Sequence, residues 1–280
     1  MMIGALAPYE TSLAGAGPLA MLADDGDSIT LDVERYLAAV DTADSSVLER
    51  CRGPVLDVGC GPGRMVAALA ERGIAALGVD IAPMAVELTR SRGVSVLLRD
   101  LFARVPGEGR WPTALVIDGN IGIGGDVDRV LRRLDALLAA DGRAVIETAP
   151  EPATDRTLQV RFARGTVATG PRFAWSVIGA DALATRAARV GFTVLARWSV
   201  GNRSFVELGH QELPLAEREH RPVEHPPAEH RTPEHPRTER GPLEHRPLEH
   251  RPLEHRPLEH RRSERRPVRM AHRFRRQRGA

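Results

Sequence analysis

The chain has 280 residues, with 37 acidic residues and 39 basic residues that are all arginine, a length that suits one large or two small domains. Through Gly209 there are 22 arginines and 25 acidic residues, whereas from His210 onward there are 17 arginines and 12 acidic residues. The net charge of +2 is therefore the sum of a slightly acidic body and a basic tail. Two cysteines are too few for a disulfide framework. No apolar run approaches the ~20 residues that span a bilayer, and no basic secretory leader is evident. We therefore expect a cytoplasmic protein that is not membrane-bound.

The predicted elements alternate between helices and strands from residue 32 to residue 209. Helices are expected at 32–40, 45–51, 63–73, 83–93, 126–142 and 181–191, and strands at 54–59, 74–80, 94–100, 113–119, 143–148, 192–200 and 204–209. This alternation predicts a mostly parallel sheet covered on both faces. Only three residues separate the last two strands, so they form a hairpin and the final strand is antiparallel.

Residues 210–280 have a different composition. The motif RPLEH recurs in 241-GPLEHRPLEHRPLEHRPLEH-260, and proline at every fifth position prevents a continuous helix. Its low apolar content predicts a disordered tail, in which the histidines hold metal weakly at most. The last 20 residues contain nine arginines, so contact with nucleic acid stays a secondary possibility beside that of a solvated extension.

The strongest functional signal is 55-VLDVGCGPGRMVAALAERG-73, a strand that runs through three glycines into a helix. A phosphate-binding loop of the ATP type requires a lysine, which the chain lacks. A dinucleotide loop has a third glycine where Arg64 stands here, and Asp57 would repel a pyrophosphate. S-adenosylmethionine instead carries an ammonium, a sulfonium and a carboxylate, and no phosphate. Asp57 can attract that ammonium directly or through water, while N–H groups of the loop bind the carboxylate.

Two further acids follow the next two strands. Asp80 ends the strand 74–80, where a carboxylate can hold ribose hydroxyls. Asp100 ends the third strand and is placed to accept a hydrogen bond from the adenine amino group.

With these acids, the motifs 57-DVGCGPG-63, 78-GVDIAP-83, 98-LRDLF-102, 116-VIDGNIGIGGD-126 and 134-LDALLAADGRAVIE-147 resemble the class I S-adenosylmethionine-dependent methyltransferases, in particular small bacterial ones of unassigned substrate. The resemblance implies a Rossmann-like, doubly wound seven-stranded α/β sheet of order 3-2-1-4-5-7-6, with the last strand antiparallel. It implies a helical lid segment at 1–50 and the methyltransferase domain at 51–209, and the tail at 210–280 that composition predicts follows them. The cofactor-binding residues that it implies are Asp57, Gly59, Cys60, Gly61, Gly63, Asp80, Ile81, Asp100, Leu101 and Asp118.

The acceptor side is less defined by the sequence. Asp118 and Asn120 follow the fourth strand, where the methyl group should face the substrate, and they either orient the acceptor or shape a turn. Phe173 and Trp175 either line a substrate pocket or pack in the core, and packing is the favoured interpretation. The body has no histidine, so a base, if one is needed, is a carboxylate such as Asp118. We expect a small-molecule acceptor; an NAD-dependent reductase, a non-catalytic S-adenosylmethionine-binding module and a nucleic-acid-associated protein are the alternatives.

Overall fold

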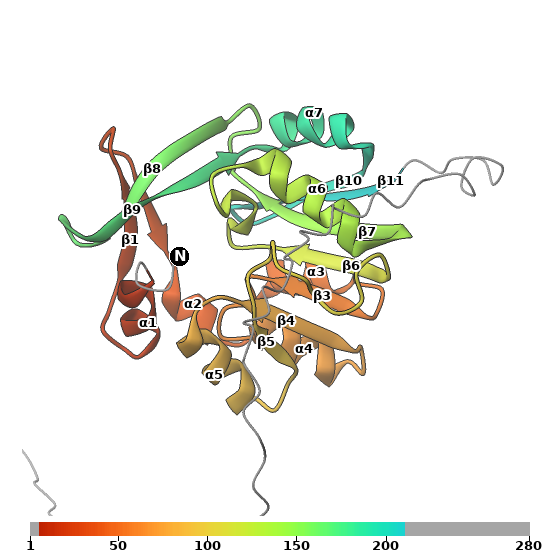
Figure 1. Cartoon of the computed structure of the whole chain (residues 1–280), viewed down its shortest axis with the longest axis horizontal. Coiled ribbons are helices and arrows are strands. Elements are labelled where there is room, and N and C mark those ends of the chain that lie inside the picture. The colour runs from red at the N-terminus through yellow and green to blue at the C-terminus, as the bar shows by residue number, and fades with distance from the viewer. Residues whose placement is uncertain (1–5, 211–280) are drawn as a thin grey trace, which may run out of the picture. The chain divides into compact units, whose positions relative to one another are not determined.

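The computed structural model describes residues 6–210, which form two β-sheets with flanking helices (Figure 1). The large sheet has the order β10-β11-β7-β6-β3-β4-β5. Its strands are β3 (Val55–Val58), β4 (Ala76–Asp80), β5 (Val96–Leu98), β6 (Trp111–Val116), β7 (Leu138–Thr148), β10 (Phe192–Val200) and β11 (Arg203–His210). Only β11 is antiparallel to its neighbours, which confirms the predicted strand order and the reversed hairpin strand. The predicted tail falls almost wholly outside the described residues.

The large sheet is covered on both faces because its central strands are apolar on both faces. Leu56, Val58 and neighbouring residues of β6 and β7 pack against α6 (Val127–Leu137) and α7 (Ala180–Val190). On the opposite face Val55 packs against α3 (Thr42–Leu48) and α4 (Arg64–Glu71). α5 (Pro83–Ser91) adjoins β4 and β5. Asp57 alternates with Leu56 and Val58 along β3, so its carboxylate lies on the face of α3 and α4.

A second sheet, of order β2-β1-β8-β9, was missed by the sequence analysis (Figure 1). It joins a hairpin of β1 (Leu19–Ala23) and β2 (Ser28–Leu31) to a hairpin of β8 (Asp155–Arg164) and β9 (Val167–Ile178). The segment expected to be a helical lid therefore contains two strands between α1 (Ala7–Leu13) and α2 (Val33–Leu37). Strands β1 and β8 pair although about 140 residues separate them in the sequence. Local sequence patterns do not predict such a long-range contact.

Glycines fix the second sheet to the end of β6. The short helix η2 (Asn120–Gly122) packs on β9 so closely that a Cβ at Gly122 would lie 2.1 Å from the carbonyl oxygen of Ser176. A Cβ at Gly125 would lie 2.5 Å from the Cβ of Ala174. The glycines of 116-VIDGNIGIGGD-126 thus allow close backbone approach, and they hold β9 beside the segment that was expected to face the substrate.

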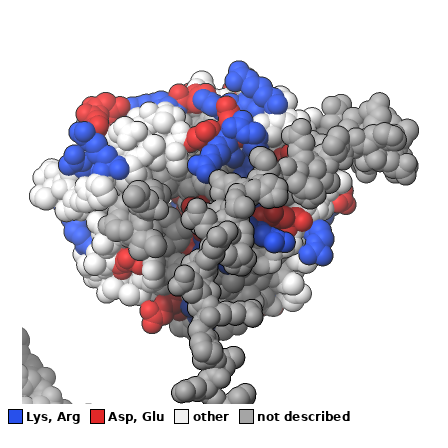
Figure 2. Space-filling view, viewed as in Figure 1, with Lys and Arg blue, Asp and Glu red and all other residues white. Residues whose placement is uncertain are grey.

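The exposed surface carries mixed charge. On the face shown in Figure 2, arginine side chains are interspersed with acidic ones rather than gathered into one basic area. None of the helices within residues 6–210 has the length and apolar character that a membrane span requires.

Candidate functional site

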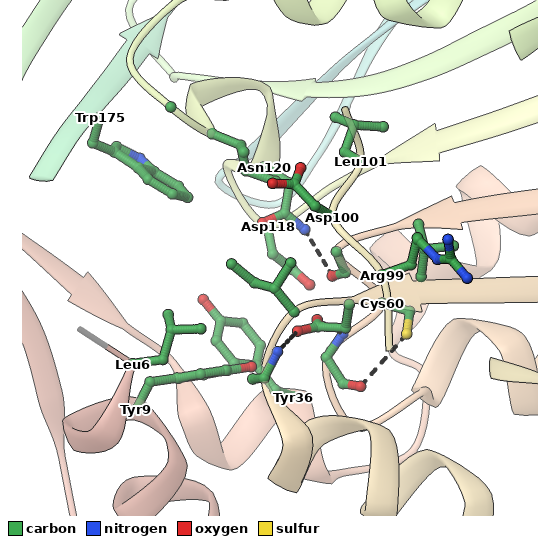
Figure 3. A pocket seen from close by; sticks show the side chains of 18 of the residues that line it. Leu6, Tyr9, Tyr36, Cys60, Arg99, Asp100, Leu101, Asp118, Asn120 and Trp175 are labelled. Carbon is green, nitrogen blue, oxygen red and sulfur yellow. Dashed lines mark hydrogen bonds between the residues drawn. The ribbon is translucent and has the colours of Figure 1, made fainter. Parts of the chain in front are cut away.

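A cavity of about 620 Å³ lies between the carboxyl ends of β3 to β6 and the second sheet (Figure 3). This volume is ordinary for a small-molecule site, which occupies about 300–1,000 Å³. Eight of the ten residues expected to bind a cofactor line it: Gly59, Cys60, Gly61, Asp80, Ile81, Asp100, Leu101 and Asp118. Asp57 and Gly63 do not line the cavity.

The glycine loop is closed by side chains from three other segments. The amide of Asn120 donates to the carbonyl oxygens of Gly59 at 2.9 Å and Val58 at 3.1 Å, and it occupies the space of a Cβ at Gly59. The hydroxyl of Tyr9 would lie 3.3 Å from a Cβ at Gly61, and Thr89 fills the space beside Gly63. The loop N–H groups of Gly59, Cys60, Gly61 and Gly63 all donate within the protein.

Asp80 connects the loop to the next helix. Its Oδ2 accepts from the Gly61 N–H at 2.9 Å and its Oδ1 from the Ala82 N–H at 2.8 Å. Burial raises the pKa of Asp80, although these backbone hydrogen bonds oppose the rise. Each oxygen keeps a second lone pair for a ligand in the cavity. Asp100 is more exposed, and within residues 6–210 it accepts only the Phe102 N–H, at 2.8 Å.

Cys60 has a structural role. A Cβ added at Gly78 would lie 2.6 Å from the Cys60 sulfur, so a larger residue does not fit at position 78. Burial raises the pKa of the Cys60 thiol well above its usual range, so the reactive thiolate is scarce.

Asp57 is buried without a partner. Its side chain is 1% exposed, and neither carboxylate oxygen has a hydrogen bond within the described residues. Burial raises its pKa to about 7, and the neighbouring Arg64 only partly offsets this. Acidic neighbours, Asp118 among them, raise the pKa further.

Behind the cavity, Asp118 is bound by three guanidinium groups that the sequence analysis did not identify. Arg64 donates to both oxygens, at 2.7 and 3.0 Å, Arg35 donates at 2.8 Å, and Arg203 lies 3.4 Å away. Its backbone adopts φ +58°, and its N–H donates to Glu147 Oε2 at 2.7 Å. If the acceptor requires a general base, these contacts make Asp118 a poor candidate, because its lone pairs already accept hydrogen bonds from cationic donors.

The same arginines join further buried carboxylates into one cluster. Arg64 binds Asp44 with two hydrogen bonds of 2.9 and 3.0 Å. Arg203 binds Asp44 at 2.7 Å and Glu147 at 2.8 Å through each of two nitrogens. Burial favours the neutral form of Asp44, but hydrogen bonds from Arg64 and Arg203 outweigh it and lower its pKa to about 2. We call these residues the buried ion cluster: Arg35, Arg64, Arg203, Asp44, Asp118 and Glu147.

Aromatic side chains form the wall opposite the glycine loop. Phe162, Phe173 and Trp175 of the second sheet line the cavity, together with the chain's two tyrosines, Tyr9 and Tyr36 (Figure 3). The interpretation of Phe173 and Trp175 as packing residues only was therefore wrong, because it ignored the second sheet. The hydroxyls of Tyr9 and Tyr36 have no hydrogen-bond partner within residues 6–210, and burial raises the pKa of both.

The cavity thus has two chemically different ends. A polar end combines the glycine loop with Asp80 and Asp100, and an apolar end is formed by the second sheet. The carboxylates of Asp44, Asp118 and Glu147 face three guanidinium groups, so the ion cluster is balanced. Asp80 and Asp100 have no guanidinium partner within residues 6–210, and their carboxylates favour a ligand that carries a positive charge at the polar end.

Comparisons with known proteins agree with this geometry. The sequence model of a family described as "Methyltransferase domain" matches residues 35–197. Among solved structures, a SAM-dependent methyltransferase from Bacteroides fragilis in complex with S-adenosyl-L-homocysteine is similar, with a TM-score of 0.61 and 22% identity over 75% of this chain and 94% of that one. The 1,6-didemethyltoxoflavin-N1-methyltransferase of Burkholderia thailandensis has 22% identity and a TM-score of 0.49 over 63% of this chain and 80% of its own. At these identities the likeness concerns the fold.

Proposed function

The chain belongs to the methyltransferase domain family, and from this premise we propose that it transfers the methyl group of S-adenosylmethionine to a small-molecule acceptor. One observation carries the proposal: Asp80 is held by two backbone N–H groups at the edge of the glycine loop, with its remaining lone pairs available to the cavity. A carboxylate so placed suits a pair of ribose hydroxyls, and it suits no phosphate group.

The rest of the polar end fits the other parts of the same cofactor. Asp100, Leu101 and Ile81 line the polar end of the cavity, and we expect the adenine to lie beside them. The carboxylates of Asp80 and Asp100 suit the ammonium and the sulfonium through the electrostatic field, whereas Asp57 is too buried for direct contact. Gly59 and Gly61 keep the loop clear of side chains on the ligand side.

The carboxylate of the cofactor needs donors other than the loop. The N–H groups of the loop already donate hydrogen bonds within the protein. They are therefore not available to the carboxylate, contrary to the expectation from the sequence. The hydroxyl of Tyr9, which would lie 3.3 Å from a Cβ at Gly61, is one donor that lines the cavity beside the loop. α1 is anchored over the loop, since Glu10 accepts the Met84 N–H at 3.3 Å and Arg164 binds the hydroxyl of Thr11 at 2.6 Å.

The protein's contribution to methyl transfer is orientation and exclusion of water. S-adenosylmethionine supplies a methyl group that is already activated by its sulfonium. The chain has to align an acceptor with that methyl group and keep water out. The second sheet and α1 provide the apolar wall that does both.

Calorimetric titration with S-adenosylmethionine and S-adenosylhomocysteine tests the proposal. Asp80→Ala should weaken both by about 100-fold, because two charge-assisted hydrogen bonds of about 1.5 kcal/mol each are lost. Asp141→Ala, at an exposed site away from the cavity, is the matched control and should bind as the wild type does. Absence of binding by the wild-type protein would falsify the proposed function.

A further inference from the structure

A second cavity of about 210 Å³ adjoins the main one beside the second sheet. The two cavities share five lining residues, namely Met21, Leu31, Tyr36, Asp118 and Trp175. Residues at the carboxyl ends of β6 and β7 also line the second cavity, and this is the edge at which open α/β sheets bind their ligands. An acceptor in the second cavity would therefore meet the cofactor across the shared residues.

The charged side chains that line the second cavity are mostly acidic. Asp32, Asp118 and Glu147 contribute three carboxylates, whereas Arg35 contributes the one guanidinium group among the lining residues within 6–210. The other two arginines of the buried ion cluster do not line this cavity. Its surface is therefore negative, although the cluster behind it is balanced.

Asp32 carries a negative charge in addition to those of the buried ion cluster, whose three guanidinium groups balance its three carboxylates. Asp32 shares Arg35, whose Nε lies 3.4 Å from Asp32 Oδ2 while its Nη1 donates to Asp118 at 2.8 Å. Asp32 Oδ1 accepts the backbone N–H of Arg35 at 3.1 Å, and Oδ2 accepts no hydrogen bond within residues 6–210. The side chain of Asp32 is 57% exposed, so it lies on the solvent side of the cavity and can still accept from a ligand.

Tyr36 offers a second polar atom without a partner. It is 8% exposed and lines both cavities, and its hydroxyl makes no hydrogen bond in the described part of the chain. A buried hydroxyl that lacks a partner costs free energy, and a ligand that donates a hydrogen bond to it would remove this cost. Because Tyr36 lines both cavities, that contact would form where they meet and where methyl transfer has to take place.

The rest of the second cavity is largely apolar. Its walls include side chains of the second sheet and of η2, among them Ile29, Ile121, Val177 and Ile178. A volume of about 210 Å³ is below that of sites for drug-sized ligands, so the cavity suits a small apolar body. A ligand with such a body, a positive charge for Asp32 and a donor for Tyr36 matches all of these features.

We propose that the acceptor is a small primary or secondary amine on an apolar body, which binds as an ammonium ion in the second cavity and is methylated on nitrogen. This rests on the proposed function and names its substrate class. Aliphatic amines carry a positive charge at neutral pH. They also have a lone pair once a proton is lost, which a quaternary ammonium ion does not.

The reaction releases one proton. The ammonium gives it to the Asp32 carboxylate, which returns it to water because its side chain is half exposed. The nitrogen lone pair then forms a bond to the methyl carbon while the carbon–sulfur bond breaks, and that electron pair stays on sulfur. The products are the methylated ammonium ion and S-adenosylhomocysteine. Asp118 and Glu147 are less suited to take the proton, since their oxygens accept from guanidinium groups.

Three probes of matched shape test the proposal: benzylamine, benzyl alcohol and benzoate, which at neutral pH are cationic, neutral and anionic. Each is titrated calorimetrically into the full-length protein saturated with S-adenosylhomocysteine. Benzylamine should bind at least about tenfold more tightly than either of the others, because it alone brings a positive charge to the acidic lining. After incubation of benzylamine with S-adenosylmethionine and the protein, mass spectrometry should detect N-methylbenzylamine.

Matched variants locate the charge. Asp32→Asn removes the charge and keeps a residue that caps α2, so it should weaken benzylamine about fivefold and leave benzyl alcohol unchanged. Asp27→Asn is the control, because Asp27 is 58% exposed and pairs with an arginine but lines neither cavity; it should change neither affinity. Tyr36→Phe should weaken benzylamine about tenfold through the loss of one hydrogen bond to a charged group.

The affinity for S-adenosylhomocysteine shows that each variant is folded. The inference is overturned if benzylamine does not bind, if benzyl alcohol or benzoate binds as tightly, or if no N-methylbenzylamine forms. It is also overturned if Asp32→Asn or Tyr36→Phe leaves the affinity for benzylamine intact. Failure of the wild-type protein to bind S-adenosylhomocysteine overturns instead the function on which the inference rests.

Discussion

Substitution of Asp57 by asparagine should remove a pH dependence of stability that this one carboxyl group creates. Asp57 is 1% exposed and its oxygens have no hydrogen-bond partners within residues 6–210. Burial therefore favours its neutral form and raises its pKa from 3.8 to about 7 in the folded protein. Asparagine has nearly the same shape and does not titrate.

The sign and size follow from proton linkage. Between pH 4 and pH 7 the folded protein holds a proton on Asp57 that the unfolded chain has lost, so the stabilising contribution is complete below pH 4 and is lost as the pH rises through 7. With pKa values of 3.8 and about 7, the free energy of unfolding should fall by about 2.5 kcal/mol between pH 5 and pH 8 because of this group alone.

Urea denaturation of the wild type and Asp57→Asn at pH 5 and pH 8 measures this contribution. All other titrating groups are common to the two proteins, so they cancel when the difference in unfolding free energy is compared between the two pH values. The variant should gain about 2.5 kcal/mol relative to the wild type on going from pH 5 to pH 8. A difference that stays constant within about 0.5 kcal/mol would mean that Asp57 is solvated or paired, and the reasoning would be wrong.

Three other substitutions or treatments probe the packing around the site. Arg64→Ala should lower the free energy of unfolding by about 3–5 kcal/mol, because it removes one of the three cations that balance the carboxylates of the ion cluster; a loss below about 1 kcal/mol in urea denaturation would argue against the ion cluster. Gly122→Ala should cost about 1–3 kcal/mol by collision with the Ser176 carbonyl, whereas an unchanged melting temperature would show that β9 moves freely. Iodoacetamide should leave Cys60 unmodified in the native protein and alkylate it in urea, since burial raises the pKa of its thiol; rapid labelling of the native protein, read by mass spectrometry, would contradict this.

The sequence predicted the large sheet because each of its strands carries a local signal. Glycines follow β3, α5 begins at Pro83, and β3 and the second half of β6 are continuous buried and mainly apolar runs. The second sheet was missed because its pairing is non-local, and because the first half of β9 carries mostly exposed residues. The cofactor end was predictable from acids at strand ends. The acceptor end was not, because Trp175 reaches the cavity only through the packing of β9 on η2.

Arg64 shows why the two ends of the site depend on one another. It stands where a dinucleotide-binding loop has a glycine for close helix–strand packing, and its guanidinium instead extends to Asp44 of α3 and to Asp118 at the end of β6. Together with Arg35 and Arg203 it balances the charges of Asp44, Asp118 and Glu147. Asp80 and Asp100 then remain as the carboxylates without a guanidinium partner at the polar end of the cavity, within residues 6–210. A pyrophosphate would add negative charge beside them, whereas an ammonium and a sulfonium would offset theirs. The residue that excludes a dinucleotide therefore also balances the cluster behind a site that favours a cationic cofactor.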